Sequence, residues 1–172
     1  WSSDVCSSDL KQAAPTSLPQ LMQGYTAWVN AVEAGGAKGL GGRRVIGAVS
    51  PVVVAALDEA GVSLASAGLS VEQREITHLF ADARKGDKAV SRDWVYGLPE
   101  RLGKPDAVIY DATPGNEALL YVWKNGERYV RVVVRPNFRM KGENYTNAVR
   151  SASNVAQRDL QGKSMTLLEG EL

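Results

Sequence analysis

The sequence predicts an α+β domain in which N-terminal helices pack on one face of a three- to four-stranded antiparallel sheet. Apolar residues recur at helical spacing before residue 103, whereas the segments after residue 105 read as strands. Asn125 and Gly126 stand between two of these later segments, and this pair is a strong hairpin signal because its turn requires positive φ. The order of helices followed by strands is typical of an α+β plan.

The two ends of the chain are expected to lie outside the folded domain. Residues 1–10 look like the in-frame translation of a sequencing adapter, which predicts an artefact joined to a metagenomic fragment of a longer protein. The only cysteine, Cys6, belongs to this segment, so cysteine usage indicates no redox compartment. Without Asp4 and Asp9 the chain has 20 basic and 17 acidic residues, a net charge of +3. Residues 161–172 are expected to form a polar tail that frays.

Residues 11–42 are expected to form a linker, one helix and a glycine-rich connector. The helix is predicted over 19–34, because four large apolar residues recur at helical spacing: Leu21, Tyr25, Trp28 and Val32. The connector over 35–42 lacks the Gly-Lys-Ser/Thr ending of a phosphate-binding loop. Residues 43–160 then form the predicted α+β domain.

The first half of that domain is predicted to be mainly helical. Residues 43–49 are a short strand candidate, and Ser50 followed by Pro51 begins a helix in the favoured way. A further helix is predicted over 70–85, with Ser70 as its N-cap and Gln73 completing a capping box. Short helical turns are expected over 90–96 and 98–102.

The helix over 70–85 carries the only histidine, His78. At 100° per residue, Ile76, Leu79 and Phe80 form one apolar face, and His78 lies on the opposite, charged side. The histidine is therefore either aimed into a cleft or left in water. The sequence alone leaves both alternatives open.

The second half is predicted to hold the sheet, with strands over 107–111, 118–123 and 128–135 and a fourth over 145–153. The third strand alternates: Val130, Val132 and Val134 point one way, whereas Arg131 and Arg135 point the other. One face of the sheet is thus suited to covering by helices. The other face carries arginines and aromatic residues.

A series of short pieces in order resembles the C-terminal region of Mu F-like phage head morphogenesis (minor head) proteins. The pieces are the segments 25–28, 45–47, 74–78, 98–102, 105–111, 119–122, 132–137 and 147–152. The resemblance covers most of residues 25–160. It implies a phage or prophage origin, with portal or capsid proteins as partners and the virion or the bacterial host cytoplasm as location.

C-terminal domains of that family often resemble toxins or nucleases of the barnase, EndoU, colicin and RelE type. The resemblance therefore implies that RNA is a possible substrate. Metal-independent RNA cleavage needs proton transfer and cations that stabilise the charge developing on phosphate. His78 is the proton-transfer candidate, Arg131 and Arg135 are the phosphate clamp, and Lys85 assists from the helix.

A second group of residues is expected to contact nucleic acid. Arg150, Asn147 and Ser151 match a patch of the resemblance, and Tyr121 or Trp123 is a candidate for stacking a base. With one histidine and no cysteine outside residues 1–10, no metal or other cofactor is expected. No apolar run approaches the roughly 18 residues of a membrane span.

Two functions remain open on the sequence, an enzyme and a non-catalytic module. The enzyme would be a nuclease-like effector domain, and it predicts that His78 and the arginine strand face line one concave cleft. The module would dock on portal or capsid protein or on packaged DNA. It predicts a histidine on a convex surface or a covered arginine face.

Overall fold

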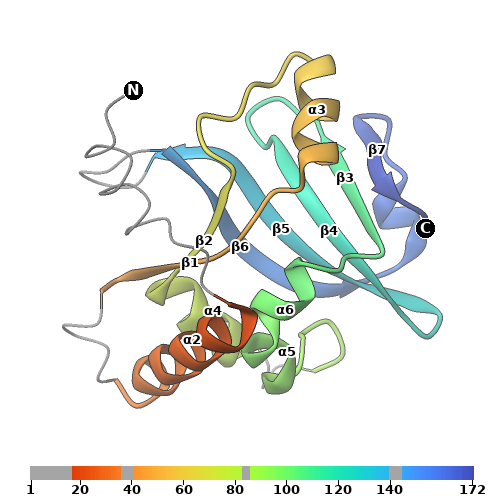
Figure 1. Ribbon diagram of the computed structural model, residues 1–172. Coiled ribbons are helices and arrows are strands. Elements are labelled where there is room, and N and C mark those ends of the chain that lie inside the picture. The colour runs from red at the N-terminus through yellow and green to blue at the C-terminus, as the bar shows by residue number, and fades with distance from the viewer. Residues whose placement is uncertain (1–16, 36–40, 83–85, 140–144) are drawn as a thin grey trace, which may run out of the picture.

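The computed structural model describes residues 17–35, 41–82, 86–139 and 145–172. In these residues five α-helices accompany one mixed seven-stranded sheet, of strand order β1-β2-β6-β5-β4-β3-β7 (Figure 1). Neighbouring strands are antiparallel except β2 and β6, which are parallel. The α+β class is confirmed. The prediction of a three- to four-stranded antiparallel sheet was wrong, because strands were missed on both sides of it.

The helices are α2 (Leu18–Glu33), α3 (Pro51–Glu59), α4 (Gln73–Asp82), α5 (Arg92–Tyr96) and α6 (Leu98–Leu102), with a 3-10 helix η1 (Gln157–Leu160). The strands are β1 (Arg43–Ala48), β2 (Gly68–Glu72), β3 (Ala107–Asp111), β4 (Ala118–Asn125), β5 (Arg128–Arg139), β6 (Tyr145–Val155) and β7 (Met165–Gly170). Ser17 begins α2 through a capping box, and Ser50 caps α3 through the amide of Val53.

The four strands expected from the sequence, β3 to β6, form a continuous antiparallel meander in the middle of the sheet. The hairpin between β4 and β5 is present, but its turn is one residue later than predicted. Asn125 pairs with Arg128, so the two turn residues are Gly126 and Glu127. Gly126 alone has a positive φ, of 63°, which is the pattern of turns with glycine at the first central position.

The helix predicted over 70–85 begins later, because its first residues form β2. Leu69, Ser70 and Val71 are fully buried between β1 and β6. Buried backbone amide and carbonyl groups need hydrogen-bond partners, and as a strand these residues find them in the neighbouring strand on each side. Ser70 is therefore not an N-cap. Its hydroxyl lies 2.7 Å from that of Thr146 in a hydrogen bond between β2 and β6.

The C-terminal segment was expected to fray, but it forms the edge strand β7. Five of its residues pair with β3, and the amide of Glu171 donates to the oxygen of Asp106 at 3.1 Å. Leu168 packs against the main hydrophobic core, and Met165 packs against a second cluster. The few apolar residues among polar ones thus suffice to hold an edge strand.

The main hydrophobic core lies between the sheet and the helices. It contains buried residues of all five described helices, with Trp28 of α2 among the fully buried ones. Val130, Val132 and Val134 of β5 belong to this core, as their alternation predicted. A smaller cluster lies on the other face of the sheet, where Ile109, Leu120, Val122, Tyr129 and Val155 pack with Leu160 of η1.

Candidate functional site

The structure does not bring His78 together with Arg131 and Arg135. His78 is exposed on α4, and α4 packs through Ile76, Leu79 and Phe80 into the main core. Arg131 and Arg135 alternate with the core valines of β5, so they point to the opposite face of the sheet. The expected single cleft of these three residues is therefore absent from the described structure.

The two strand arginines also have separate surroundings. Arg135 donates from Nη2 to the backbone oxygen of Gly115 at 2.8 Å. Arg131 lies near Asp111. Burial raises the pKa of Asp111, but hydrogen bonds from Thr113 and Ser164, with the charge of Arg131, outweigh it and lower the pKa below its ordinary value. Lys85, the fourth predicted catalytic residue, lies outside the described residues.

Asn147 was predicted to bind nucleic acid, but its amide is fully used within the fold. The side chain is 0% exposed, and its Nδ2 donates to the oxygens of Ser66 and Gly68 at 2.7 and 3.0 Å. Its Oδ1 accepts from the amide of Asn137 at 3.2 Å. Asn147 thus fastens the loop before β2 to the sheet. Ser151 is exposed and pairs with Val133, which places it on the Arg131 face.

Tyr121, the predicted stacking residue, is buried in the main core at 2% exposure and is closed to a base. Its alternative, Trp123, is also buried and donates from Nε1 to the oxygen of Lys104 at 3.1 Å. The Tyr121 hydroxyl has no hydrogen-bond partner among the residues that the structure describes. Burial raises the pKa of Tyr121, and the charge of Glu169 adds to this.

This unpaired hydroxyl gives a stability prediction with a matched control. Tyr121→Phe is expected to leave the free energy of unfolding unchanged or to raise it by up to about 1 kcal/mol, because it removes a buried unsatisfied group. Tyr25→Phe is expected to lower it by about 1 kcal/mol, since the Tyr25 hydroxyl donates to the oxygen of Val95 at 2.6 Å. Urea denaturation of both variants tests the contrast, and equal losses would contradict it.

A cluster of charged residues lies where β2 passes into α4, beside β6. We call it the Glu75–Arg150 cluster; its members are Glu72, Arg74, Glu75, Phe138 and Arg150. Glu75 is a buried carboxylate, 6% exposed, whose Oε1 lies 3.3 Å from Nη1 of Arg150 and 3.3 Å from Nη2 of Arg74. Nη1 of Arg150 also lies 3.7 Å from Oε1 of Glu72.

A β-bulge aims Arg150 at this cluster. Ser151 pairs with Val133 and Val149 pairs with Val134, so Arg150 is the extra residue of β6. Its guanidinium carbon lies 4.9 Å from the ring centre of Phe138 on β5. The Arg150 side chain is 29% exposed, although its Nη1 is buried. Its buried Nη1 makes no hydrogen bond of good geometry with either carboxylate.

His78 lies on the edge of α4 that faces the Glu75–Arg150 cluster. In a helix with 3.6 residues per turn, His78 lies between Arg74 and Glu75 around the axis, about 40° from Arg74 and about 60° from Glu75. It is exposed, as Arg74 is. His78 therefore lies one turn along α4 from Arg74 and Glu75, the two residues by which the helix takes part in the cluster.

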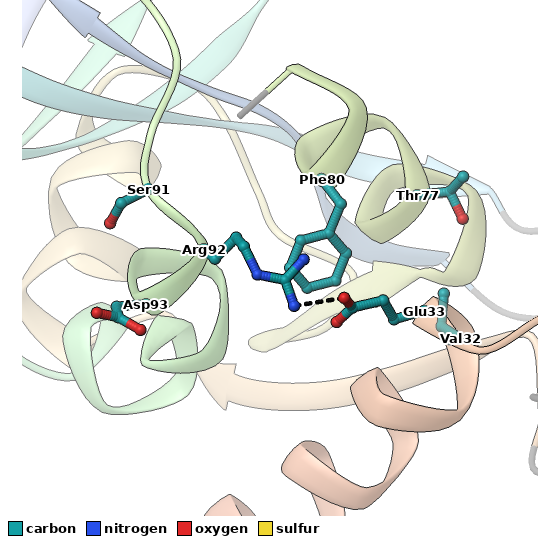
Figure 2. A pocket seen from close by; sticks show the side chains of 7 residues that line it. All are labelled: Val32, Glu33, Thr77, Phe80, Ser91, Arg92 and Asp93. Carbon is teal, nitrogen blue, oxygen red and sulfur yellow. Dashed lines mark hydrogen bonds and ion pairs between the residues drawn. The ribbon is translucent and has the colours of Figure 1, made fainter. Parts of the chain in front are cut away.

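A pocket of about 600 Å³ lies on another edge of α4. Figure 2 shows Arg92 extending over Phe80 to an ion pair with Glu33 at the end of α2, with Thr77 near the rim. The guanidinium carbon Cζ of Arg92 lies 4.9 Å from the centre of the Phe80 ring. The lining of this pocket holds one cation and two carboxylates, Glu33 and Asp93, whereas the Glu75–Arg150 cluster holds two of each, so the pocket offers less to an anionic substrate.

Sequence reasoning identified His78 and Arg150 as site residues but missed Glu72, Arg74, Glu75 and Phe138. One signal was present: Glu75 precedes Leu79 by four residues, so a carboxylate stands at the margin of the apolar face of α4. The bulge that turns Arg150 toward α4 depends on strand register. That register is set by the whole sheet and leaves no local mark in the sequence.

The described residues contain no group of three or more His, Cys, Asp or Glu placed to hold a metal ion. None of the described helices is both long and apolar enough to cross a membrane. In three comparisons with known proteins, no family model matches this chain, and neither a curated protein nor a solved structure matches it.

Proposed function

We propose that this chain is a metal-independent ribonuclease-like domain whose reaction centre is His78 with the Glu75–Arg150 cluster. The single observation that supports it is the buried Glu75 carboxylate, which lies 3.3 Å from the guanidinium groups of both Arg74 and Arg150 on the His78 side of α4. This proposal moves the phosphate-binding role from Arg131 and Arg135 to Arg74 and Arg150. It keeps His78 as the proton-transfer group.

Each part of this arrangement has a defined chemical task. Arg74 and Arg150 stabilise charge on the phosphate, because guanidinium groups donate paired hydrogen bonds to its oxygens. His78 transfers a proton, since the ordinary pKa of imidazole lies near neutrality. Glu72, whose side chain is 28% exposed, is the second proton-transfer group. Glu75 is too buried to reach RNA, and its task is to position the two arginines.

The resemblance to phage head morphogenesis proteins supplies the setting of this proposal. In that setting the domain is the C-terminal part of a minor head protein, located in the virion or in the host cytoplasm. Portal or capsid proteins are its partners, and RNA is its substrate. The contiguous meander of β3 to β6, with helices on one face, agrees with the plan of the nucleases named above.

One observation favours a second function, a non-catalytic module that docks on portal, capsid or packaged DNA. His78 is exposed on α4 and does not share a cleft with Arg131 and Arg135, the arrangement that the enzyme alternative required. In that case Arg74 and Arg150 form part of a contact surface. The two functions differ in whether His78 is needed for a reaction.

The test is RNA cleavage by the wild-type protein and His78→Ala, with a chelator present. We expect wild type to cleave single-stranded RNA and His78→Ala to lose at least about 100-fold in rate, the size of a general acid–base contribution. Circular dichroism and thermal unfolding check that the variant is folded. Equal cleavage by both proteins would contradict the role of His78. No cleavage of any RNA by either would favour the docking module.

A further inference from the structure

A second basic site lies where the paired ends of β5 and β6 meet Lys88 and η1. It is a pocket of about 390 Å³, and its lining residues are Lys88, Arg128, Arg131, Ser153, Asn154, Val155 and Asp159. Three of these side chains are cationic, and one is a carboxylate. We infer that this pocket binds a phosphate group, presented either as a free phosphate monoester or by an RNA phosphodiester. The inference does not rest on the proposed function.

The lone carboxylate of the pocket is already engaged. Oδ2 of Asp159 accepts a hydrogen bond from the amide of Ala156 at 3.0 Å, at the start of η1. Asp111, the other acid near Arg131, accepts from Thr113 and Ser164 at 2.6 to 3.0 Å. Within the described residues neither acid lies within ion-pair distance of Lys88, Arg128 or Arg131. The pocket lining thus keeps an excess of positive charge for an anion.

Arg131 supplies the donor that points to a ligand. Its Nε is buried and has no hydrogen-bond partner within the described residues. Buried donors in folded proteins are nearly always paired with the chain itself, with water or with a ligand, so this one is available to a group supplied from outside the chain. A phosphate oxygen is such a group, because the fork of a guanidinium matches the geometry of two phosphate oxygens.

The pocket is also held in shape before any ligand arrives. The backbone amide of Asn154 donates to the backbone oxygen of Lys88 at 2.7 Å, which holds the segment of Lys88 against β6. Its Nδ2 donates to the oxygens of Asp87 and Ala89 at 3.2 and 2.8 Å. Arg128 donates from Nη2 to the Asn154 oxygen at 3.3 Å, which leaves its other donors for a ligand. A preorganised site binds more tightly because less ordering is needed on binding.

The experiment titrates the intact protein with inorganic phosphate at constant ionic strength, following the backbone amides of residues 153–155 by NMR. A second arm uses a short DNA oligonucleotide, which presents phosphodiesters and resists ribonuclease cleavage. The variants are Lys88→Gln and Arg131→Gln, and the control is Lys104→Gln, an exposed lysine outside the pocket. Saturation by phosphate assigns a monoester site, and saturation by the oligonucleotide alone assigns a phosphodiester site.

We expect saturable binding that weakens about tenfold or more in Lys88→Gln and in Arg131→Gln, with Lys104→Gln unchanged. If Arg131→Gln fails to fold, Lys88→Gln still tests the inference, because Lys88 is exposed and its substitution is expected to leave the fold intact. Absence of saturation with both anions would overturn the inference. Equal weakening in Lys88→Gln and Lys104→Gln would also overturn it, since that result indicates a nonspecific charge effect.

Discussion

Arg150→Gln is expected to lower kcat/KM for RNA cleavage by at least about 100-fold, the cost of removing one donor to a developing oxyanion. The reason is the position of Arg150, because the bulge in β6 directs its guanidinium toward Glu72 and Glu75 while the side chain as a whole stays 29% exposed. Arg150→Lys keeps the charge but loses the planar fork, so its rate is expected to lie between those of wild type and Arg150→Gln. Steady-state cleavage assays measure both.

The control for Arg150→Gln is Arg158→Gln, which removes an exposed arginine of η1. It is expected to cleave like wild type. Arg150→Gln is also expected to lose about 1–3 kcal/mol of unfolding free energy, because it takes a partner from the buried Glu75. The cleavage assays of Arg150→Gln should therefore be run well below the melting temperature of this variant. A full rate in folded Arg150→Gln would contradict the proposed reaction centre.

Gly170→Ala is expected to be the most destabilising of the glycine substitutions, although only two residues follow Gly170 in the described chain. Gly170 has a φ of 78°, and a Cβ there would overlap the Asp106 oxygen and lie 2.9 Å from Cα of Ala107. Both contacts are backbone of the neighbouring strand, which cannot move aside without breaking the pairing of β3 with β7. Urea denaturation and amide hydrogen exchange of β7 measure the loss.

Gly61→Ala is the matched control, because Gly61 has a similar φ of 84° but open space around its Cβ position. An alanine at this position adds backbone strain but no steric overlap, so we expect Gly61→Ala to lower the free energy of unfolding by about 1–2 kcal/mol. Gly170→Ala is expected to lose about 1–3 kcal/mol more, from the steric overlap. Equal losses in the two variants would show that β7 is not packed on β3 as described.

The sequence predicted the parts of the fold that local pattern determines. Helices with a clear cap, such as α3 after Ser50, and strands with clear alternation, such as β5, are where they were expected. Two elements were missed for a common reason. β2 is a short apolar run directly before a helix, and β7 is a mostly polar edge strand, so tertiary pairing decides both of them.

The candidate site was harder to predict than the fold. Periodicity placed His78 on the polar side of its helix and Arg131 on the polar side of its strand, and the structure agrees with each. It gave no information on whether those two sides face each other, and they do not. Arg150 and Glu75 meet because of a bulge and a parallel strand pair, which are long-range features of the sheet.

The most direct test of the proposed centre is an NMR footprint of a 2′-O-methyl RNA, which binds but lacks the hydroxyl that cleavage requires. We predict that amide shifts on binding concentrate at residues 73–79 of α4 and 149–151 of β6, around Arg74, His78 and Arg150. Binding that leaves all of these amides unchanged, with shifts elsewhere on the molecule, would contradict the assignment of this junction as the RNA site.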